Sequence, residues 1–135
     1  STFNVAQTLY QLQAAGLLPI LTHPERNPII VSQPELLDQL ASAGCLFQIT
    51  ANSLTGFWGK RAQQFCVEML RERMVHFIAS DAHGVKNRTP VLSQARDAAA
   101  RIVGPAEAEK LVAANPAAVV SGQLLDQSSW ETPKR

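Results

Sequence analysis

The sequence has few of the features that mark membrane or nucleic-acid-binding proteins. None of its apolar runs approaches the roughly 20 residues that a membrane-spanning helix requires, so we expect no membrane insertion. The formal net charge is only +1, which excludes the broad basic surface typical of nucleic-acid binding. We therefore expect no nucleic acid among its partners.

Cysteine is also scarce. Cys45 and Cys66 lie far apart in the sequence and lack the spacing of a metal site. We expect both to be reduced, buried thiols of a cytoplasmic protein rather than a disulfide pair. Neither lies in a phosphate-binding loop, which argues against a phosphatase that uses a thiol nucleophile.

Several catalytic motifs are absent as well. The chain has no glycine-rich phosphate loop, no dinucleotide-binding fingerprint and no Gly-x-Ser-x-Gly elbow. Among hydrolytic chemistries, metal-assisted hydrolysis remains, in which a metal lowers the pKa of a bound water and arginines hold the phosphate.

The composition is that of a globular domain, with 46% hydrophobic and 17% charged residues. Hydrophobic spacing predicts a helix that begins near Val5 and stops at Gly16, followed by a buried strand at 17–21. Ser32 and Glu35 have the spacing of a capping box, which predicts a helix that ends at Gly44.

The second half continues this alternation. We expect strands at 45–50 and 75–79, separated by an amphipathic helix over 62–70. Thr89-Pro90 resembles a helix N-cap followed by a proline at the first helical position. That helix breaks at Gly104-Pro105, a short helix continues to Ala114, and Asn115-Pro116 opens a last turn or helix. The polar segment 127–135 reads as a C-terminal tail.

Short strands that alternate with helices predict an α/β protein with a parallel sheet and flanking helices. Three buried parallel strands make a poor sheet by themselves, because the outer two would expose apolar edges. We therefore expect part of a larger barrel, with a small three-layer sandwich as the alternative. Exposed edges also predict association with another copy or with a missing half.

Polar residues cluster directly after each predicted strand, where parallel α/β proteins carry their active sites. Asp81 and His83 are two residues apart, so in extended backbone they point to the same side. A carboxylate and an imidazole that converge suit zinc or a divalent transition metal. His23 follows another strand and is a candidate third ligand, although a structural role is the alternative for each of these residues.

Two arginines are candidates for binding phosphate. Arg26 lies three residues after His23, and its guanidinium can present a fork to phosphate oxygens. Arg88 follows Asp81 and His83 and is the second candidate, with a solvated loop cation as the alternative. Glu25 is either an acid/base or, as we favour, a partner of Arg26. His76 lies inside a strand and reads as a packed histidine, whereas Lys60, Arg61, Arg71 and Arg73 read as a solvated helix face.

Three segments, 20–26, 48–53 and 78–83, resemble the protein-tyrosine phosphatases of bacterial capsule and exopolysaccharide operons, which belong to the PHP (polymerase and histidinol phosphatase) superfamily. The resemblance continues through Arg88 to Pro90 and over 111–122, and so covers nearly the whole chain in order.

This resemblance implies a distorted (β/α)7 barrel, of which residues 1–126 would form the C-terminal portion and 127–135 a tail. It implies metal ligation by His23, Asp81 and His83, phosphate binding by Arg26 and Arg88, and a cluster of divalent metals, with manganese expected and iron or zinc as alternatives. The implied substrate is phosphotyrosine on an autophosphorylating bacterial tyrosine kinase.

The family pattern also contains an N-terminal His-x-His pair, a further Asp and His, and a glutamate ligand, none of which this chain supplies. We therefore expect the catalytic cluster to be incomplete here. Two alternatives remain open, namely a small-molecule phosphatase such as one for histidinol phosphate, and a non-catalytic or kinase-docking fragment.

Overall fold

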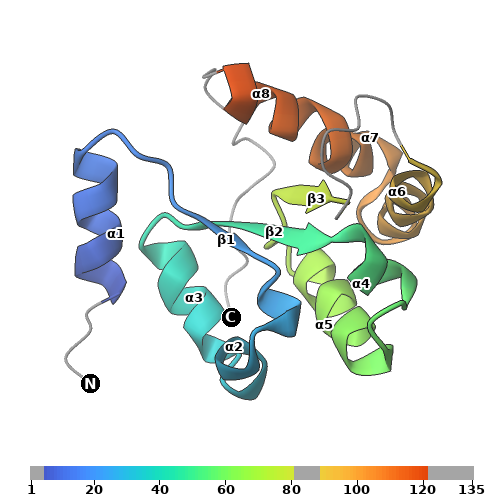
Figure 1. Ribbon diagram of the computed structural model, residues 1–135, viewed down its shortest axis with the longest axis horizontal. Helices are drawn as coiled ribbons and strands as arrows, with labels where there is room; N and C mark the ends of the chain where they lie inside the picture. Colours follow the sequence, from blue (N-terminus) through green and yellow to red (C-terminus); the bar gives the residue numbers. More distant parts are fainter. Residues whose placement is uncertain (1–4, 81–88, 122–135) are drawn as a thin grey trace.

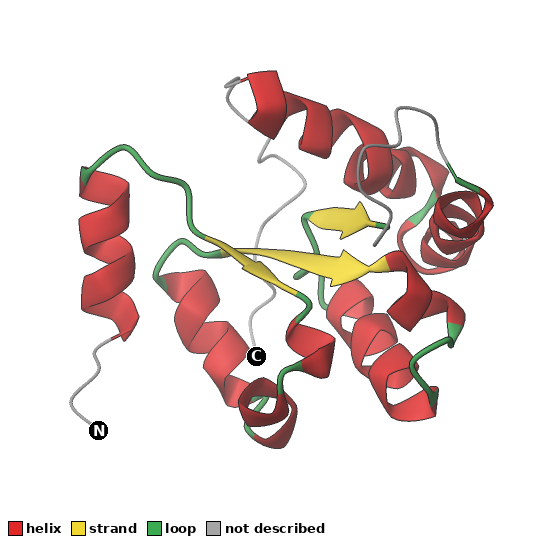
Figure 2. Ribbon diagram, viewed as in Figure 1, coloured by secondary structure: helices red, strands yellow, loops and turns green. Residues whose placement is uncertain are grey.

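A computed structural model describes residues 5–80 and 89–121. Three short strands form a parallel sheet at the centre, and helices surround it (Figures 1 and 2). The elements, in chain order, are α1 (Val5–Ala14), β1 (Ile20–Thr22), η1 (Pro24–Arg26), α2 (Pro28–Ser32), α3 (Glu35–Ser42), β2 (Leu46–Thr50), α4 (Ala51–Thr55), α5 (Lys60–Arg71), β3 (Phe77–Ala79), α6 (Pro90–Val103), α7 (Pro105–Glu109), η2 (Lys110–Ala114) and α8 (Asn115–Ser121).

The sheet has the order β1-β2-β3, and both strand pairs are parallel. Leu21 pairs with Phe47, and Ile49 pairs with Ile78. Within the described part of the chain, β1 and β3 therefore have a strand on one side only. The mixed α/β architecture with a small parallel sheet confirms the coarse prediction of fold class.

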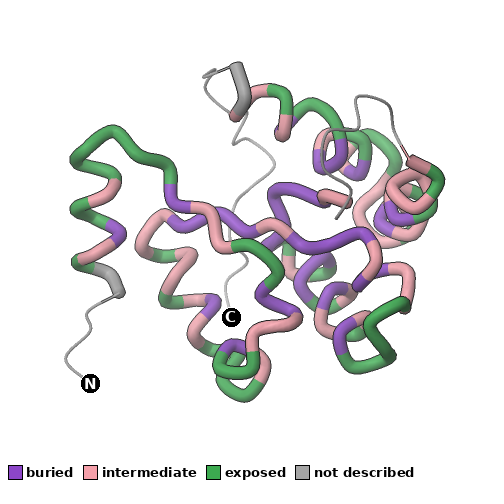
Figure 3. Tube along the Cα trace, viewed as in Figure 1, coloured by how far each residue is buried: buried purple, intermediate pink, exposed green. Residues whose placement is uncertain are grey.

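Alternation along β2 divides the core between the two faces of the sheet. Phe47 and Ile49 are fully buried and face the large cluster that α5 and α6 complete with Met69 and Ala99. On the opposite face Leu46 packs in a much smaller cluster with Phe77, Ile20 and Val119. Figure 3 shows the buried trace concentrated in the strands and in the inner sides of these helices.

The first strand is shorter than the sequence indicated. It begins at Ile20 rather than at Leu17, and Leu17 and Leu18 are 57% and 47% exposed. Pro19 lacks an N–H, but its carbonyl accepts a hydrogen bond from Leu46 at 3.0 Å and so leads into the ladder. The other two strands begin at Leu46 and Phe77, also inside their predicted ranges.

The predicted capping box at Ser32 and Glu35 is wrong. Ser32 ends α2, where its hydroxyl donates to the carbonyl of Ile29 at 3.0 Å, and Pro34 occupies the N-cap of α3. The reason is that a helix begins earlier, at Pro28. The Asn27 side chain caps this helix by accepting hydrogen bonds from two of its backbone amides, and Pro28 occupies the first turn of α2. The short helices η1, α2 and α4 were not predicted.

Local signals in the second half are confirmed. Thr89 caps α6, because its hydroxyl accepts from the backbone N–H of Leu92 at 3.2 Å. Gly104 adopts a φ of 92° and ends that helix. The helical segment then runs through a π-helical turn to Ala114, and Asn115 opens α8. None of the helices in the described ranges is long and apolar enough to cross a membrane.

Candidate functional site

The candidate site lies where β1 and β2 end. Both strands run in the same direction, so η1, which follows β1, lies beside Thr50, the last residue of β2. The backbone N–H of His23 donates to the carbonyl of Gln48 at 2.8 Å and extends the ladder by one bond. This arrangement brings two of the three predicted polar clusters together at the carboxyl ends of β1 and β2.

His23 lies at the turn from β1 into η1. Its φ of 40° and ψ of 55° place it in the left-handed region, which few non-glycine residues adopt. Its side chain is exposed. A strained backbone of this kind is common at functional sites, and it presents the imidazole at the strand end rather than in the core.

Glu25 is buried beneath this turn, with an exposure of 3%. Its Oε2 accepts a hydrogen bond from the backbone N–H of Thr50 at 3.1 Å, while its Oε1 has no hydrogen-bond partner among the described residues. The carboxylate thereby ties η1 to the end of β2. The amide of Thr50 is a partner that the sequence did not indicate.

Arg26 is oriented from two sides. Its Nη2 donates to the hydroxyl of Thr50 at 3.3 Å, and its guanidinium carbon lies 4.7 Å from the ring centroid of Trp58, within the range of a cation–π interaction. Thr50 is thus shared, since its N–H binds Glu25 and its hydroxyl binds Arg26. These contacts reduce the number of positions that the guanidinium can sample.

Trp58 was not identified from the sequence. It lies in the turn between α4 and α5, next to Phe57, whose ring meets it edge-on at 5.3 Å between centroids. Gly56 and Gly59 bracket the pair with φ values of 102° and 97°, which only glycine adopts readily. Two exposed aromatic side chains between two glycines are the signal that could have indicated this turn.

A cavity of about 450 Å³ opens beside Arg26 and Trp58. Arg61 at the start of α5 also lines it, so this arginine does more than cover a solvated helix face. The other lining residues are Glu25, Pro28, Val31 and Ala62.

The Cys66 thiol lies on α5 close to this site and is fully buried. Burial raises its pKa above the ordinary thiol value, and the negative charge of Glu25 acts in the same direction, while Arg26 opposes both. Burial also raises the pKa of the Cys45 thiol. Both cysteines are free and buried, as the sequence predicted.

The other predicted site residues, Asp81, His83 and Arg88, lie outside the described residues. Over the ranges 5–80 and 89–121, no group of three or more His, Cys, Asp or Glu side chains could hold a metal ion. The described part therefore contributes one of the predicted metal donors, His23. An imidazole exposed at a strand end is a donor that suits zinc or a divalent transition metal.

His76 is a packed histidine, as predicted. It is 7% exposed, and its Nδ1 accepts a hydrogen bond from the backbone N–H of Phe47 at 2.9 Å. Its carbonyl accepts from the Asn115 side chain at 2.9 Å. These bonds join β3 to β2 and to the start of α8, away from the polar strand ends.

Parallel strands surrounded by helices, with polar residues and an oriented arginine at the carboxyl ends of the strands, define an α/β protein whose candidate site lies at that end of its sheet. Comparison with known proteins identifies the family more closely. The chain belongs to the capsular polysaccharide synthesis family CpsB/CapC, whose profile matches residues 1–121. The resemblance noted in the sequence is thus confirmed.

Individual relatives agree with this assignment. CapC of Staphylococcus aureus is 46% identical over 88 residues, which are 65% of this chain and 34% of CapC. The tyrosine-protein phosphatase YwqE of Bacillus subtilis is 44% identical over 82 residues, which are 61% of this chain and 32% of YwqE. The chain therefore matches about a third of the length of these two relatives.

The fold is also similar to a solved structure. That structure comes from work on YwqE of B. subtilis and CpsB of Streptococcus pneumoniae, described as metal-dependent tyrosine phosphatases. The TM-score is 0.81 at 33% identity, and the match covers 96% of this chain and 52% of the solved one. The similarity extends over nearly all of this chain and about half of its neighbour.

Proposed function

We propose that this chain is the C-terminal, phosphate-binding part of a metal-dependent protein-tyrosine phosphatase that acts in capsular or exopolysaccharide synthesis. The observation that carries the proposal is Arg26, held by Thr50 and Trp58 at the carboxyl end of two parallel strands. Family membership supports the same reaction class, because a relative and a structural neighbour are described as tyrosine phosphatases.

In this proposal Arg26 binds the phosphoryl oxygens of phosphotyrosine, together with Arg88. His23, Asp81 and His83 hold divalent metal, with manganese as the expected ion and iron or zinc as alternatives. The metal, when bound, supplies an activated water and screens phosphoryl charge. Glu25 holds the amide of Thr50, so its role is to position Arg26 and not to transfer a proton.

The finer architecture is also a proposal. Residues 1–126 would form the C-terminal portion of a distorted (β/α)7 PHP barrel, and 127–135 a polar tail. The one-sided strands β1 and β3 and the small cluster on one sheet face support a sheet that continues beyond three strands. A site that is completed by further strands, or by a second copy, agrees with the few metal donors in the described part.

The proposed substrate is a phosphotyrosine protein, with an autophosphorylating bacterial tyrosine kinase as the expected partner and the cytoplasm as the expected location. Buried, reduced thiols support the location.

Hydrolysis of a phosphotyrosine peptide tests the proposal, with manganese, iron or zinc added and with Asp81→Ala, His83→Ala and Arg26→Gln as variants. The assay uses this chain and a longer protein that also carries the N-terminal His-x-His pair of the family. We expect metal-dependent turnover at least in the longer protein, and each variant should lower it at least tenfold. A small phosphomonoester hydrolysed faster than the peptide would favour a small-molecule phosphatase. Peptide binding that depends on Arg26 without any turnover would identify a binding fragment, and the absence of both would refute the assignment.

A further inference from the structure

A second positively charged side chain lines the cavity beside Arg26. Arg26 and Arg61 both line it, and Glu25 is the one carboxylate among its lining residues. Glu25 is buried and already accepts the amide of Thr50. The Arg61 side chain is exposed and forms no ion pair or hydrogen bond with a residue in the described ranges. The cavity thus offers a guanidinium that an anionic group can still pair with.

Trp58 supplies an aromatic face to the same cavity. It is 47% exposed although it stacks on Arg26, so part of the indole remains available for contact. The indole adds apolar area that a free phosphate ion would not use. The combination of an arginine fork and an aromatic face is typical of sites that bind a charged side chain together with its carbon stem.

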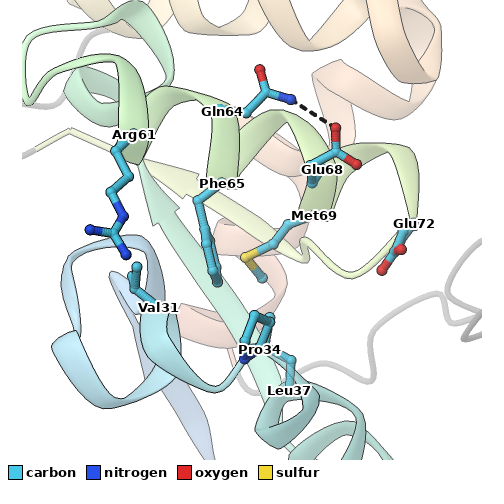
Figure 4. A pocket seen from close by; sticks show the side chains of 9 residues that line it. All are labelled: Val31, Pro34, Leu37, Arg61, Gln64, Phe65, Glu68, Met69 and Glu72. Atoms are coloured by element: carbon cyan, nitrogen blue, oxygen red, sulfur yellow. Dashed lines mark hydrogen bonds between the residues drawn. The ribbon is translucent and has the colours of Figure 1, made fainter.

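The cavity also continues along α5. Val31 and Arg61 line both this cavity and a second one, likewise of about 450 Å³, between α5 and the α2–α3 segment. Figure 4 shows Arg61 reaching toward Val31 at one end of the second cavity, with Phe65, Met69 and Leu37 further along it. The second cavity is lined by these apolar side chains and also by Gln64, Glu68 and Glu72. A basic compartment that leads into a second, longer groove fits an extended peptide better than a compact phosphomonoester.

From these observations we infer that the cavity between Arg26, Trp58 and Arg61 binds an acidic side chain that flanks the phosphotyrosine of a peptide substrate. The inference rests on the proposed function and gives it a specificity element. Arg26 contacts the phosphoryl group, Arg61 pairs with the flanking carboxylate, and Trp58 packs against the stem of that acidic residue. Arg61 and Trp58 are then substrate-binding residues outside the metal site.

Two phosphotyrosine peptides test this inference, identical except that the flanking glutamates of one are glutamines in the other. Their affinities for the full chain are measured by fluorescence anisotropy in buffer without metal. We expect the acidic peptide to bind about fivefold more tightly, the scale of one exposed charge pair. Arg61→Gln should remove this preference, so the affinity for the acidic peptide should fall by more than the affinity for the neutral peptide.

The chain supplies matched controls. Lys60→Gln removes the same charge from the adjacent residue, which does not line either cavity, and should keep the preference. Trp58→Leu should lower the affinity for both peptides. Phe57→Leu changes a side chain that lines neither cavity and should lower neither affinity. Equal affinity of the unaltered chain for the two peptides would overturn the inference. So would an equal loss in the Lys60 and Arg61 variants, because that result indicates nonspecific attraction.

Unphosphorylated versions of both peptides separate the two proposals. If phosphorylation adds no affinity and the Arg61-dependent acidic preference persists, the proposed phosphatase function fails, and the link of this cavity to phosphotyrosine fails with it. If phosphorylation adds affinity through Arg26 but no acidic preference appears, the proposed function stands and the inference about Arg61 is wrong.

Discussion

His76 forms two hydrogen bonds with the backbone of Phe47 at the start of the β2–β3 ladder, one through its ring and one through its backbone N–H. Nδ1 of His76 accepts from the N–H of Phe47 at 2.9 Å, and the N–H of His76 donates to the carbonyl of Phe47, also at 2.9 Å. The first bond needs a lone pair on Nδ1, so the ring must be neutral. Burial lowers the pKa of His76 from 6.5 to about 4.

This pKa predicts a pH-dependent stability. Between about pH 6.5 and pH 4 the unfolded chain binds a proton at His76 while the folded chain does not, so stability is present above this range and is lost as the pH falls through it. The full shift corresponds to about 3 kcal/mol of unfolding free energy. Urea denaturation at pH 7, 5.5 and 4 measures the loss.

His76→Asn is the control for this prediction, because its side-chain oxygen can replace Nδ1 as the acceptor but does not titrate in this range. The variant should lose about 3 kcal/mol less than the unaltered chain between pH 7 and pH 4. Parallel losses in the two proteins would contradict the assignment of the pH dependence to His76.

Replacing Glu25 should separate its structural role from its charge. Glu25→Ala leaves the buried N–H of Thr50 without its acceptor and opens a small cavity, so we expect a loss of about 2–4 kcal/mol in chemical denaturation. Glu25→Gln retains a carbonyl acceptor and should lose clearly less. Equal losses would mean that the carboxylate charge, and not the hydrogen bond to Thr50, matters for stability.

The hydroxyl of Thr50 should matter for binding more than for stability. Thr50→Val removes the acceptor for Arg26 but leaves the backbone N–H that binds Glu25. We expect about threefold weaker binding of a phosphotyrosine peptide, because Arg26 loses its hydrogen bond to the Thr50 hydroxyl. Thr50→Ser keeps the hydroxyl and serves as the control. Unchanged affinity in the valine variant would show that stacking on Trp58 is sufficient.

The length and side-chain geometry of Arg26 should be as important as its charge. Lysine at this position keeps the positive charge but loses the planar fork and much of the stacking on Trp58. We expect Arg26→Lys to weaken phosphotyrosine peptide binding about tenfold, measured by isothermal titration. Binding within a factor of two of the unaltered chain would contradict a bidentate contact.

Removing the helix cap at Thr89 should destabilise the chain. Thr89→Ala leaves the backbone N–H of Leu92 without its acceptor and should lower the unfolding free energy by about 1 kcal/mol. Thr89→Ser retains the cap and should be close to neutral. The midpoint of urea denaturation distinguishes the two variants, and a loss in the serine variant equal to that in alanine would argue against capping.

Much of the helical structure could be predicted because the signals are local. The N-cap Thr89 followed by Pro90, the break at Gly104 and the start at Asn115 each depend on a few neighbouring residues. The parallel order of the strands followed from the alternation of strands and helices. The same alternation correctly placed His23 and Arg26 just after a strand.

The strand limits and the helix that follows Pro34 needed the tertiary structure. Apolar composition favoured a strand at Leu17, but a strand begins only where a neighbouring strand can pair with it. In the described part of the chain, Leu17 and Leu18 pair with no strand residue and are exposed. Asn27 and Ser32 both carry side chains that can cap helices, and packing of the chain around η1 selected Asn27 for α2.

The candidate site likewise combines residues that the sequence indicated with contacts that only the structure revealed. Residue type and position after a strand were enough to nominate His23 and Arg26, because strand direction places such residues at one edge of the sheet. The sequence contained no sign that Thr50 would bind both Glu25 and Arg26, or that Trp58 and Arg61 would line a cavity with them. These contacts join segments about 25 to 35 residues apart, and only the packing of η1 against β2 and α5 decides which side chains meet.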